Sequence, residues 1–466
     1  MDIKPLTQAL KRIEQLITHE AEWLTDPRER EIEFHRRLER TRLLMAYLGN
    51  PQTRFDKIHI SGTSGKGSIA MICESVLLAM GLRVGTHTSP YLQIPLEKVR
   101  INGRLMQAQQ AIALVDTVMD VVEQVRISEK RLGAPHYAEA WLGLTMTHFA
   151  EQNCHVGIIE VGMGGRYDST NIITPCVSII STIHYDHTRV LGETLAEIAF
   201  HKSGIIKPNV PVVVGEIALE AFQVVEAEAA QKNSRLIHLG RDVSFEPIEI
   251  SQHGGRFSYQ GLGLSLSNIE IGLLGAHQFT NAALALAALE LYADEQGIAL
   301  QEQAIREGLA RVRFAGRLEV VQYEPMVVLD GAHNEEKMGA LIAALSEVFR
   351  HKRPILVLGM LETKNVMPIL GRLAEIAETI IATEPMVKGK PAIPAGELAK
   401  VTREAGAHQV LEEGDPLAAL EQAMSMAKPD DLIIVTGSLY LIGQVRPFWY
   451  NMKDIVEQRT MYPHHP

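Results

Sequence analysis

The sequence contains few cysteines, no long apolar run and no excess of basic residues. Its three cysteines, Cys73, Cys154 and Cys176, show no CxxC pair, so a disulfide framework and a structural zinc site are both disfavoured. No window approaches roughly 18 uninterrupted apolar residues, and charges run through the N-terminal segment, so neither a membrane span nor a signal peptide is expected. We therefore predict a cytoplasmic protein.

The charge balance excludes another group of functions. The 45 lysines and arginines are outnumbered by 56 aspartates and glutamates, which gives a formal net charge of −11. No basic field exists to hold a nucleic acid or an anionic membrane surface, so neither is an expected partner. The 46% of hydrophobic and 22% of charged residues are ordinary for a globular enzyme, and 466 residues suggest two or three domains.

The order of apolar segments predicts an α/β protein. After helical patterns near residues 5–18 and 28–48, short strand-like runs alternate with longer amphipathic segments, which is typical of a parallel sheet. The expected strands are 57–60, 156–161, 177–183 and 210–214, and the expected helices are 66–80, 107–125, 137–152 and 277–293. Residues 243–271 interrupt this rhythm with short alternating runs, which predict a small antiparallel sheet.

A second series of strands and helices begins near Arg313 and includes a helix at 335–349. We place a domain boundary there, because the following segment has the size of an independent domain. Residues 1–312 are predicted to form a domain around a mainly parallel sheet. Residues 313–466 are predicted to form a smaller, Rossmann-like α/β domain.

The strongest local signal is the loop Gly62-Thr63-Ser64-Gly65-Lys66-Gly67-Ser68 between a strand and a helix. Its glycines let backbone N–H groups turn toward phosphate oxygens, the helix N-terminus adds positive potential, and Lys66 supplies a charge. The string is not GxxxxGK[ST], because Gly62 and Gly65 are three apart and Ser68 follows Lys66 by two positions. The alternative is a glycine-rich turn with a surface lysine. The order of the features favours a P-loop-type ATP-binding domain.

Two more polar segments follow predicted strands. Glu160 ends one strand beside a glycine-rich turn, where open α/β sheets bind ligands, and it could hold Mg²⁺ or be a solvated strand end. Tyr167 stands where a dinucleotide fingerprint requires Gly or Ala, so that cofactor class is disfavoured. His187 follows another strand without an HExxH pattern, and Mg²⁺ prefers oxygen ligands, so a ligand and a loop histidine both stay open.

The segment Asp330-Gly331-Ala332-His333-Asn334 lies between a strand and a helix of the second series. Asn334 could simply cap the helix. Alternatively, Asp330 and His333 could face a ligand that is held between the two domains. The segment alone does not decide between these two interpretations.

With these segments in this order, the chain resembles the folylpolyglutamate synthase and dihydrofolate synthase family of the Mur ligase superfamily, from about residue 30 onward. The matching motifs are GTSGKGS (62–68), SPYL (89–92), EKV (97–99), YAE (137–139), EVGMGGRYDSTN (160–171), YDH (185–187), AFHKSGIIK (199–207), the segment 275–282, AGRLE (315–319), DGAHN (330–334) and TGSLYLIG (436–443). The departures from the family motifs are Ser64, Tyr91, Lys98, Tyr137 and Ala138. Most of them fall on the pterin side of the expected site.

The resemblance implies ATP and Mg²⁺ and assigns residues to them. The residues that match nucleotide contacts are Gly62, Thr63, Gly65, Lys66, Gly67, Ser68, Asn281, Arg317 and Asp330. The residues that match magnesium ligands are Ser89, Glu160 and His187. Lys202 matches a lysine that the family carbamylates. The residues that match the lining of a pteroate site are Tyr137, Ala138, Glu139, Ala140, Tyr167, Asp168 and Ser169.

The resemblance also implies a reaction. ATP would convert a carboxylate into an acyl phosphate, which the amine of L-glutamate would attack to give an amide. The expected catalytic residues are Lys66, Lys202 and His333, with His333 positioning the incoming glutamate or the intermediate. The expected substrates are L-glutamate and a folate or dihydropteroate, and a monomer is expected.

Three alternatives accompany this interpretation. The first is an enzyme that extends folates but does not use dihydropteroate. The second is a cell-wall Mur ligase, against which stand the missing UDP-binding N-terminal domain and the DGAHN form of the motif. The third is a nucleotide-driven switch, which would explain the phosphate loop but would not require Asn281, Arg317 and Asp330 together. No guanine-reading NKxD motif is evident.

Overall fold

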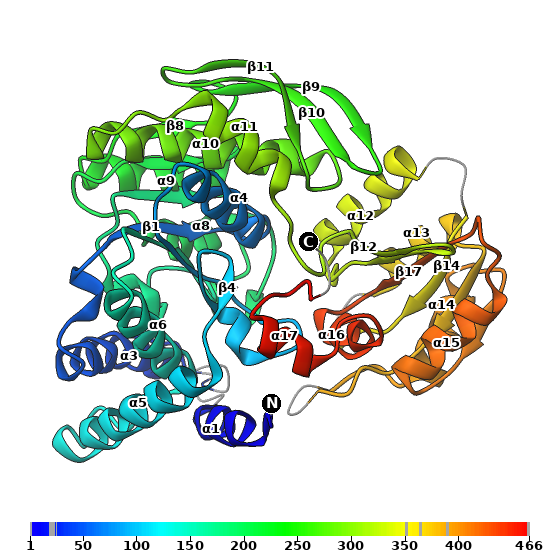
Figure 1. Ribbon diagram of the computed structural model, residues 1–466, viewed down its shortest axis with the longest axis horizontal. Helices are drawn as coiled ribbons and strands as arrows, with labels where there is room; N and C mark the ends of the chain where they lie inside the picture. The colour runs from blue at the N-terminus through cyan, green and yellow to red at the C-terminus, as the bar shows by residue number, and fades with distance from the viewer. Residues whose placement is uncertain are drawn as a thin grey trace.

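Three β-sheets organise the described residues, and the largest carries the phosphate loop. The computed structural model describes residues 2–17, 24, 26–349, 353–362, 366–387 and 391–463. Figure 1 shows the large sheet and its helices on the left, a three-stranded sheet along the top, and the second α/β unit on the right. The mixed α/β class, with a mainly parallel first sheet and a separate second sheet, is therefore confirmed.

The first sheet has eight strands. In spatial order they are β4 (Arg104–Leu105), β3 (Val99–Ile101), β2 (Val84–His87), β5 (Val156–Glu160), β1 (Asp56–Ser61), β6 (Val177–Ile180), β7 (Val212–Val214) and β8 (Leu236–His238). In this order the strands β2, β5, β1, β6, β7 and β8 are paired in parallel, while β3 pairs antiparallel with both β2 and β4. Ile60 of β1 pairs with Glu160 on one side and Ile179 on the other. The loops that follow β1, β5 and β6 therefore meet at one edge of the sheet.

Helices cover both faces of this sheet. They are α1 (Lys4–Glu14), α3 (Pro27–Tyr47), α4 (Lys66–Ala79), α5 (Ala108–Ser128), α6 (Tyr137–Glu151), α7 (Thr188–Leu191), α8 (Leu195–Ser203), α9 (Leu219–Gln231), α10 (His277–Gln296) and α11 (Glu302–Arg311). Short 3₁₀ turns occupy Pro51–Thr53, Pro95–Lys98 and Ser169–Ile172. These bounds confirm the helices expected from the sequence to within a few residues. The expectation missed α8, α9 and α11.

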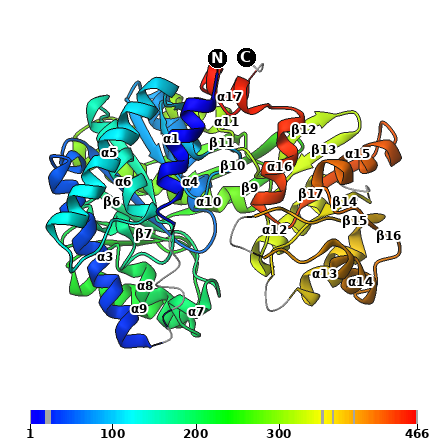
Figure 2. The same cartoon turned by 90° about the horizontal axis from the view of Figure 1, so that it is seen from below.

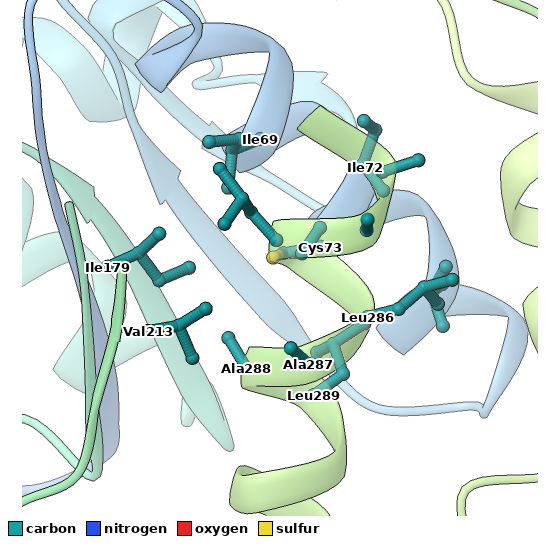
Figure 3. Packing of buried hydrophobic residues seen from close by; sticks show 14 of the residues in the cluster. Ile69, Ile72, Cys73, Ile179, Val213, Leu286, Ala287, Ala288 and Leu289 are labelled. Carbon is teal, nitrogen blue, oxygen red and sulfur yellow. The ribbon is translucent and has the colours of Figure 1, made fainter. Parts of the chain in front are cut away.

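The phosphate-loop helix is fixed by the core beneath it. Figure 3 shows Ile69, Ile72 and Cys73 of α4 facing the 286–289 turn of α10, with Ile179 and Val213 of the sheet below. The alanine-rich sequence of α10 lets most of the helix lie buried between α4 and the strands. Burial of such apolar side chains stabilises the fold at about 25 cal/mol per Å². Both helices that carry nucleotide-site candidates are thus held rigidly.

Residues 244–271 form the antiparallel sheet that the alternating pattern predicts. Its strands are β9 (Ser244–Ser251), β10 (Gly254–Gln260) and β11 (Ser265–Ile271), with β10 in the centre. Every second side chain of β10 is buried, and the Phe257 ring lies 5.2 Å from the Phe279 ring of α10. Ile250 of β9 also packs against the core of the second unit.

The second unit is built around a six-stranded sheet. In spatial order its strands are β12 (Glu319–Tyr323), β13 (Met326–Leu329), β17 (Leu432–Thr436), β14 (Ile355–Leu358), β15 (Thr379–Ala382) and β16 (Val410–Glu412). Its helices are α12 (Glu335–Val348), α13 (Met367–Ile376), α14 (Ala395–Glu404), α15 (Pro416–Met426), α16 (Leu439–Val445) and α17 (Met452–Gln458), with a 3₁₀ turn at Arg446–Phe448. Only β12 runs antiparallel to its neighbour. The boundary near Arg313 stays a prediction.

The segment after α16 returns to the first unit. Ile455, Val456 and Met461 join the core cluster that is formed by α1, α3, α5 and α6. The backbone N–H of Leu105 in β4 donates to the Arg459 carbonyl at 3.0 Å. Figure 2 shows α17 next to α1. Among the described residues, no helix combines the length and the apolar character needed to cross a bilayer.

Candidate active site

The phosphate loop packs so tightly against its neighbours that glycine is required twice. At Gly65, φ is +83°, and a Cβ atom would lie 2.3 Å from Asn281 Oδ1. At Gly62, φ is +146°, and a Cβ atom would lie 1.9 Å from Ser181 Oγ. A side chain would clash at either position, and the backbone conformation disfavours one as well. The loop therefore rests directly on α10, which brings Asn281 to it.

The Lys66 side chain lies back over this loop. Its Nζ donates to the carbonyl oxygens of Gly62 at 2.8 Å and Thr63 at 3.3 Å. Gly67 lies against the Phe314 ring, and Ser68 is buried in the first turn of α4. The predicted phosphate-binding residues thus share one helix N-terminus with an ammonium group above it, an arrangement that suits a polyphosphate.

Glu160 and Ser89 meet beside the phosphate loop. Glu160 is the last residue of β5, and its Oε2 accepts a hydrogen bond from the backbone N–H of Ser89 at 2.9 Å. Burial raises the pKa of Glu160, although Lys66 and the Ser89 N–H oppose the rise. The Lys98 ammonium donates to Ser89 Oγ at 3.4 Å and lies 5.2 Å from the centre of the Tyr137 ring. Two of the three predicted magnesium ligands are therefore adjacent.

The donor types of this pair fit Mg²⁺. This ion prefers oxygen ligands and is usually held by one or two carboxylates, substrate phosphates and several waters. The carboxylate of Glu160 and the hydroxyl of Ser89 match that preference. The described ranges contain no group of three or more His, Cys, Asp or Glu side chains that could hold a metal on its own. A metal at Glu160 and Ser89 would therefore need oxygens from a substrate.

His187 lies on the loop between β6 and α7. It is exposed, has φ of +49° and precedes α7 as its N-cap residue. Its Nε2 is 3.8 Å from Asp186 Oδ1. Burial alone would raise the pKa of Asp186, but His187 and three lysines hold this pKa below its usual value. The lysines are Lys337 of α12, Lys202 of α8 and Lys66 of α4. The role of His187 as a ligand stays a prediction.

Lys202 is a buried amine within this cationic group. Its side chain is 2% exposed, and in the described part of the chain it donates no hydrogen bond. Burial, with Lys66 as the next cause, lowers the pKa of Lys202 to about 7. Desolvation disfavours the charged form of an amine, so a large neutral fraction is present near neutral pH. That form is the one able to react with CO₂.

Two predicted nucleotide contacts come from the second unit. Asp330, directly after β13, accepts hydrogen bonds from the backbone N–H groups of Leu318 and Ala332, each at 2.9 Å. Burial lowers the pKa of Arg317, although Asp330 and Glu160 oppose this shift. Because Glu160 belongs to the first sheet, Arg317 connects the facing edges of the two sheets electrostatically.

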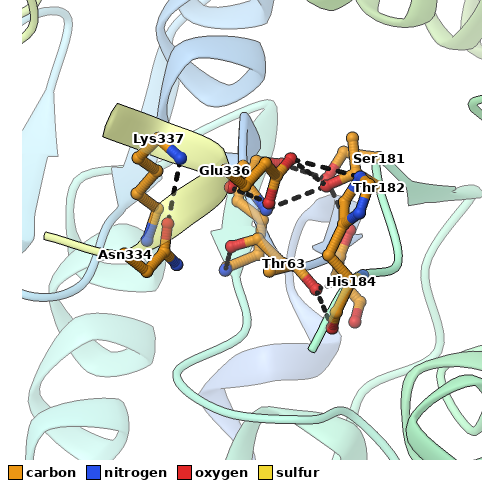
Figure 4. Close-up of polar contacts among 10 residues, drawn as sticks. Thr63, Ser181, Thr182, His184, Asn334, Glu336 and Lys337 are labelled. Atoms are coloured by element: carbon orange, nitrogen blue, oxygen red, sulfur yellow. Dashed lines mark hydrogen bonds and ion pairs between the residues drawn. The ribbon is translucent and has the colours of Figure 1, made fainter. Parts of the chain in front are cut away.

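Helix α12 of the second unit touches the phosphate loop (Figure 4). Glu336 Oε2 accepts a hydrogen bond from Ser64 Oγ at 2.8 Å, and its Oε1 accepts one from Thr182 Oγ1 at 3.4 Å. His184 Nε2 lies 3.4 Å from the same carboxylate. The Glu336 carboxylate of the second unit thus accepts hydrogen bonds from two hydroxyl groups at the phosphate loop of the first unit.

The turn before α12 confirms the helix cap, while the role of His333 toward a ligand stays a prediction. Asn334 caps the helix, because its side chain accepts a hydrogen bond from the backbone N–H of Lys337 at 3.0 Å. His333 lies 2.9 Å from the Gly331 carbonyl through Nδ1 and 3.2 Å from Lys337 Nζ through Nε2. Burial and the nearby Lys337 lower the pKa of His333 to about 3, so its ring is neutral.

Glu139, one of the predicted pteroate residues, is buried and hydrogen-bonded to other residues of the protein. Its carboxylate accepts hydrogen bonds from Arg40 Nε at 3.0 and 3.1 Å and from Thr41 Oγ1 at 3.2 Å. It also caps its own helix through the backbone N–H of His136. Of its predicted neighbours, Tyr137 lies below Lys98, Ala138 is exposed and Ala140 is fully buried.

Asp168 likewise accepts hydrogen bonds from residues of its own loop. Its Oδ1 accepts hydrogen bonds from Thr170 N at 3.0 Å and Thr170 Oγ1 at 2.6 Å, and its Oδ2 accepts one from Met163 N at 3.2 Å. Tyr167 stacks on Phe34 of α3 with ring centres 4.9 Å apart, and Ser169 is buried. The pteroate roles of these residues stay predictions.

Sequence reasoning missed three groups at the phosphate loop. Thr182 follows β6 without a motif that marks it as functional. Glu336 and Lys337 follow the DGAHN segment, which was noticed, but only the docking of α12 reveals that they face the loop. The sole available signal was the run of charged residues at 335–337, which is equally typical of a solvated helix start.

Comparison with known proteins places the chain in a family. Residues 60–289 match the Mur ligase middle domain, and residues 316–439 match the Mur ligase, glutamate ligase domain. Folylpolyglutamate synthase of Lacticaseibacillus casei is 36% identical over 414 residues, which cover 86% of this chain and 92% of that protein. Dihydrofolate synthase/folylpolyglutamate synthase of Bacillus subtilis is 32% identical over 411 residues, covering 88% and 94%.

A solved structure agrees with these matches. A folylpolyglutamate synthase in complex with AMPPCP and folate shares 30% of its sequence with this chain and superposes with a TM-score of 0.79. The alignment covers 96% of this chain and 99% of that one. The chain therefore belongs to the folylpolyglutamate synthase and dihydrofolate synthase family of Mur ligases, which are ATP-dependent glutamate ligases.

Proposed function

We propose that this protein uses ATP and Mg²⁺ to join L-glutamate to the carboxylate of a folate-type substrate, and that it accepts both dihydropteroate and reduced folates. The observation that carries the proposal is the docking of α12 on the phosphate loop, with Glu336 2.8 Å from Ser64. The loop predicted to bind phosphate and the glutamate ligase domain are thereby in direct contact. The names of the relatives support a folate-type acceptor. The Bacillus subtilis relative is named for both the dihydrofolate synthase and the folylpolyglutamate synthase activity, and the Lacticaseibacillus casei relative only for the second. An enzyme that extends folates only is the remaining alternative.

The chemistry begins with an unreactive carboxylate. Transfer of the terminal phosphoryl group of ATP gives an acyl phosphate, and attack by the glutamate amine then gives the amide, with ADP and phosphate as products. Lys66 would offset negative charge on the phosphoryl group in flight, which is mainly electrostatic work. Asn281, Arg317 and Asp330 would hold the nucleotide from both units, together with the loop residues 62–68.

Glu160 and Ser89 are the residues that would hold Mg²⁺, with His187 as the third candidate. When bound, the ion would neutralise charge on the phosphate oxygens. The amine of Lys202, once carbamylated, would become a carboxylate that complements this charge. His333 would position the incoming glutamate or the intermediate.

An acyl phosphate hydrolyses if water reaches it, so contacts from both units serve a second purpose. They allow the cleft to close around bound substrates and to exclude water during the reaction. The residues assigned to the pteroate site, the monomeric state and the cytoplasmic location remain predictions that accompany this proposal.

The test supplies purified protein with ATP, Mg²⁺ and L-glutamate, and adds dihydropteroate or tetrahydrofolate separately. We expect phosphate release and a product heavier by one glutamate residue with each acceptor. Product from tetrahydrofolate alone would restrict the protein to folate extension. A UDP-muramyl peptide serves as the control acceptor, and product from it alone would contradict the proposal.

The variant Lys66→Ala separates the nucleotide site from the fold. It removes an ammonium from a loop near the surface, so we expect loss of ligation with unchanged thermal unfolding. Turnover near that of the unchanged protein would contradict the assignment of ATP to this loop.

A further inference from the structure

Lys337 is a cation of the second unit, and its pKa is affected by the charge of Lys66 in the phosphate loop of the first. It lies one residue beyond Glu336, whose carboxylate contacts Ser64 of that loop. Burial and the nearby Lys66 lower the pKa of Lys337 to about 8. Two ammonium groups from different units are therefore close enough to repel each other.

His333 holds the Lys337 ammonium in place. His333 Nδ1 lies 2.9 Å from the Gly331 carbonyl, which can only accept, so the ring hydrogen is on Nδ1. This leaves the Nε2 lone pair free to accept a hydrogen bond from Lys337 Nζ at 3.2 Å. The imidazole thus orients the ammonium without neutralising its charge.

In the described part of the chain the Lys337 ammonium has no directly bound anion, although Asp186 and Glu336 oppose the lowering of its pKa from beyond salt-bridge distance. Within the described residues no carboxylate lies within salt-bridge distance of it, and the only hydrogen-bond acceptor at its Nζ is the neutral His333. Cations that are removed from water are normally paired, because desolvation disfavours an isolated charge. An ammonium held by a neutral ring near Lys66, without a directly bound carboxylate, is suited to receive an anion during the reaction.

We propose that Lys337 is a catalytic residue that binds the phosphoryl group during its transfer, together with Lys66, and that His333 is its positioning residue. In this step the bond from the terminal phosphorus to the bridging oxygen breaks, and its electron pair leaves with ADP. A bond forms from that phosphorus to the acceptor carboxylate oxygen. Lys337 keeps its proton throughout and stabilises the added charge. This inference rests on the proposed function, adds a residue to it, and replaces the direct positioning of glutamate by His333 with a role that acts through Lys337.

The role explains why the ammonium comes from the second unit. The charge reaches the phosphate loop only when α12 is docked there, so formation of the reactive acyl phosphate would require the closed cleft. Premature transfer to water in an open cleft would lack this charge. The coupling needs no additional element, because Lys337 and the docking residue Glu336 are neighbours on one helix.

The test compares Lys337→Met and Lys337→Arg with the matched control Lys400→Met, which changes an exposed lysine on α14 of the same unit. We expect Lys337→Met to lower kcat by about 100-fold, the scale of one lost charge-stabilising group, with KM for L-glutamate nearly unchanged. Lys337→Arg should restore part of the loss, and Lys400→Met should match the unchanged protein. Thermal unfolding checks each fold, and Lys337→Gln replaces Lys337→Met if the latter unfolds early.

A double-mutant cycle tests the positioning role. If His333 acts through Lys337, then His333→Gln should lower kcat in the unchanged protein but should add little to Lys337→Met. Independent, multiplying losses would overturn that role. A kcat of Lys337→Met within about threefold of the control, or a defect confined to KM for L-glutamate, would overturn the catalytic role. If the unchanged protein forms no product with any acceptor, the proposed function itself fails, whatever the variants do.

Discussion

Lys202 shows how burial changes the chemistry of a single residue. An ordinary lysine is almost fully charged at neutral pH, whereas burial beside Lys66 lowers the pKa of Lys202 to about 7. On this basis the neutral fraction rises from about a tenth at pH 6 to about nine tenths at pH 8. Carbamylation needs the neutral amine, so it should follow the same rise.

We expect the carbamate of Lys202 to form with labelled CO₂ at pH 8 and to be largely absent at pH 6. The carbonyl carbon is observed directly by ¹³C NMR, and added bicarbonate should raise the ligation rate more at pH 8. Lys202→Met is the control, because it removes the amine but keeps an apolar stem. An identical carbonyl signal in that variant, or no signal at pH 8, would contradict the prediction.

The lowered pKa of Lys202 also makes the stability of the fold depend on pH. Below pH 7 the buried amine carries a charge that the unfolded chain solvates better, so the cost is fully present there. Between pH 7 and 10.5 the unfolded chain binds the additional proton, so the free energy of unfolding rises with pH. Carbamylation replaces the ammonium with a carboxylate, so the stability of the carbamylated protein no longer depends on protonation of this amine.

At the scale of elements, α12 is the part of the second unit that controls the phosphate loop. Its Glu336 occupies the hydroxyls of Ser64 and Thr182, where the negative charge of a polyphosphate would be repelled. A nucleotide must therefore displace this carboxylate or bind against its charge. The contact favours the docked helix when no nucleotide is present.

Glu336→Gln keeps a hydrogen-bonding side chain and removes the charge. We expect it to tighten binding of a non-hydrolysable ATP analogue by about three- to tenfold, the effect of removing one like charge near the surface. Calorimetric titration measures the change. Glu335→Gln is the matched control, because Glu335 is exposed on the same helix turn. Equal effects of the two substitutions would assign the gain to the helix end in general.

Local patterns predicted elements well and predicted their contacts poorly. The phosphate loop, the buried α10 and the antiparallel segment 244–271 all follow from glycine spacing, composition and alternation, which act over short distances. The pairing of Glu139 with Arg40 does not follow from local sequence. A glutamate that binds an arginine of a distant helix can have the same sequence neighbours as one that binds a ligand. Likewise, nothing near Lys337 in the sequence indicates that it faces Lys66.

At the scale of the whole molecule, Arg446 connects the two units. Its guanidinium is fully buried and donates to Glu319 of β12 at 2.7 to 3.1 Å. It also donates to Gln93 in the first unit and to the Met461 carbonyl of the returning segment at 2.7 Å. One side chain therefore ties three parts of the chain that are far apart in sequence.

We expect Arg446→Met to lower the free energy of unfolding by about 3–5 kcal/mol, because Glu319 would remain buried without its partner. Urea denaturation followed by tryptophan fluorescence measures the loss. Arg126→Met is the control, since Arg126 and Glu123 form an exposed pair of the kind that contributes little. If Arg446→Met lowers the free energy of unfolding no more than the control does, the contacts of Arg446 between the two units do not stabilise the fold.

The return of residues 452–461 to the first unit also concerns the order of biosynthesis. The ribosome makes α1, α3, α5 and α6 early, yet their shared core includes Ile455, Val456 and Met461, which are made after more than four hundred other residues. Domains usually fold as they emerge, the N-terminal one first. Here the first unit keeps an open apolar face throughout translation of the second, and it closes that face only after residues 452–461 have been made.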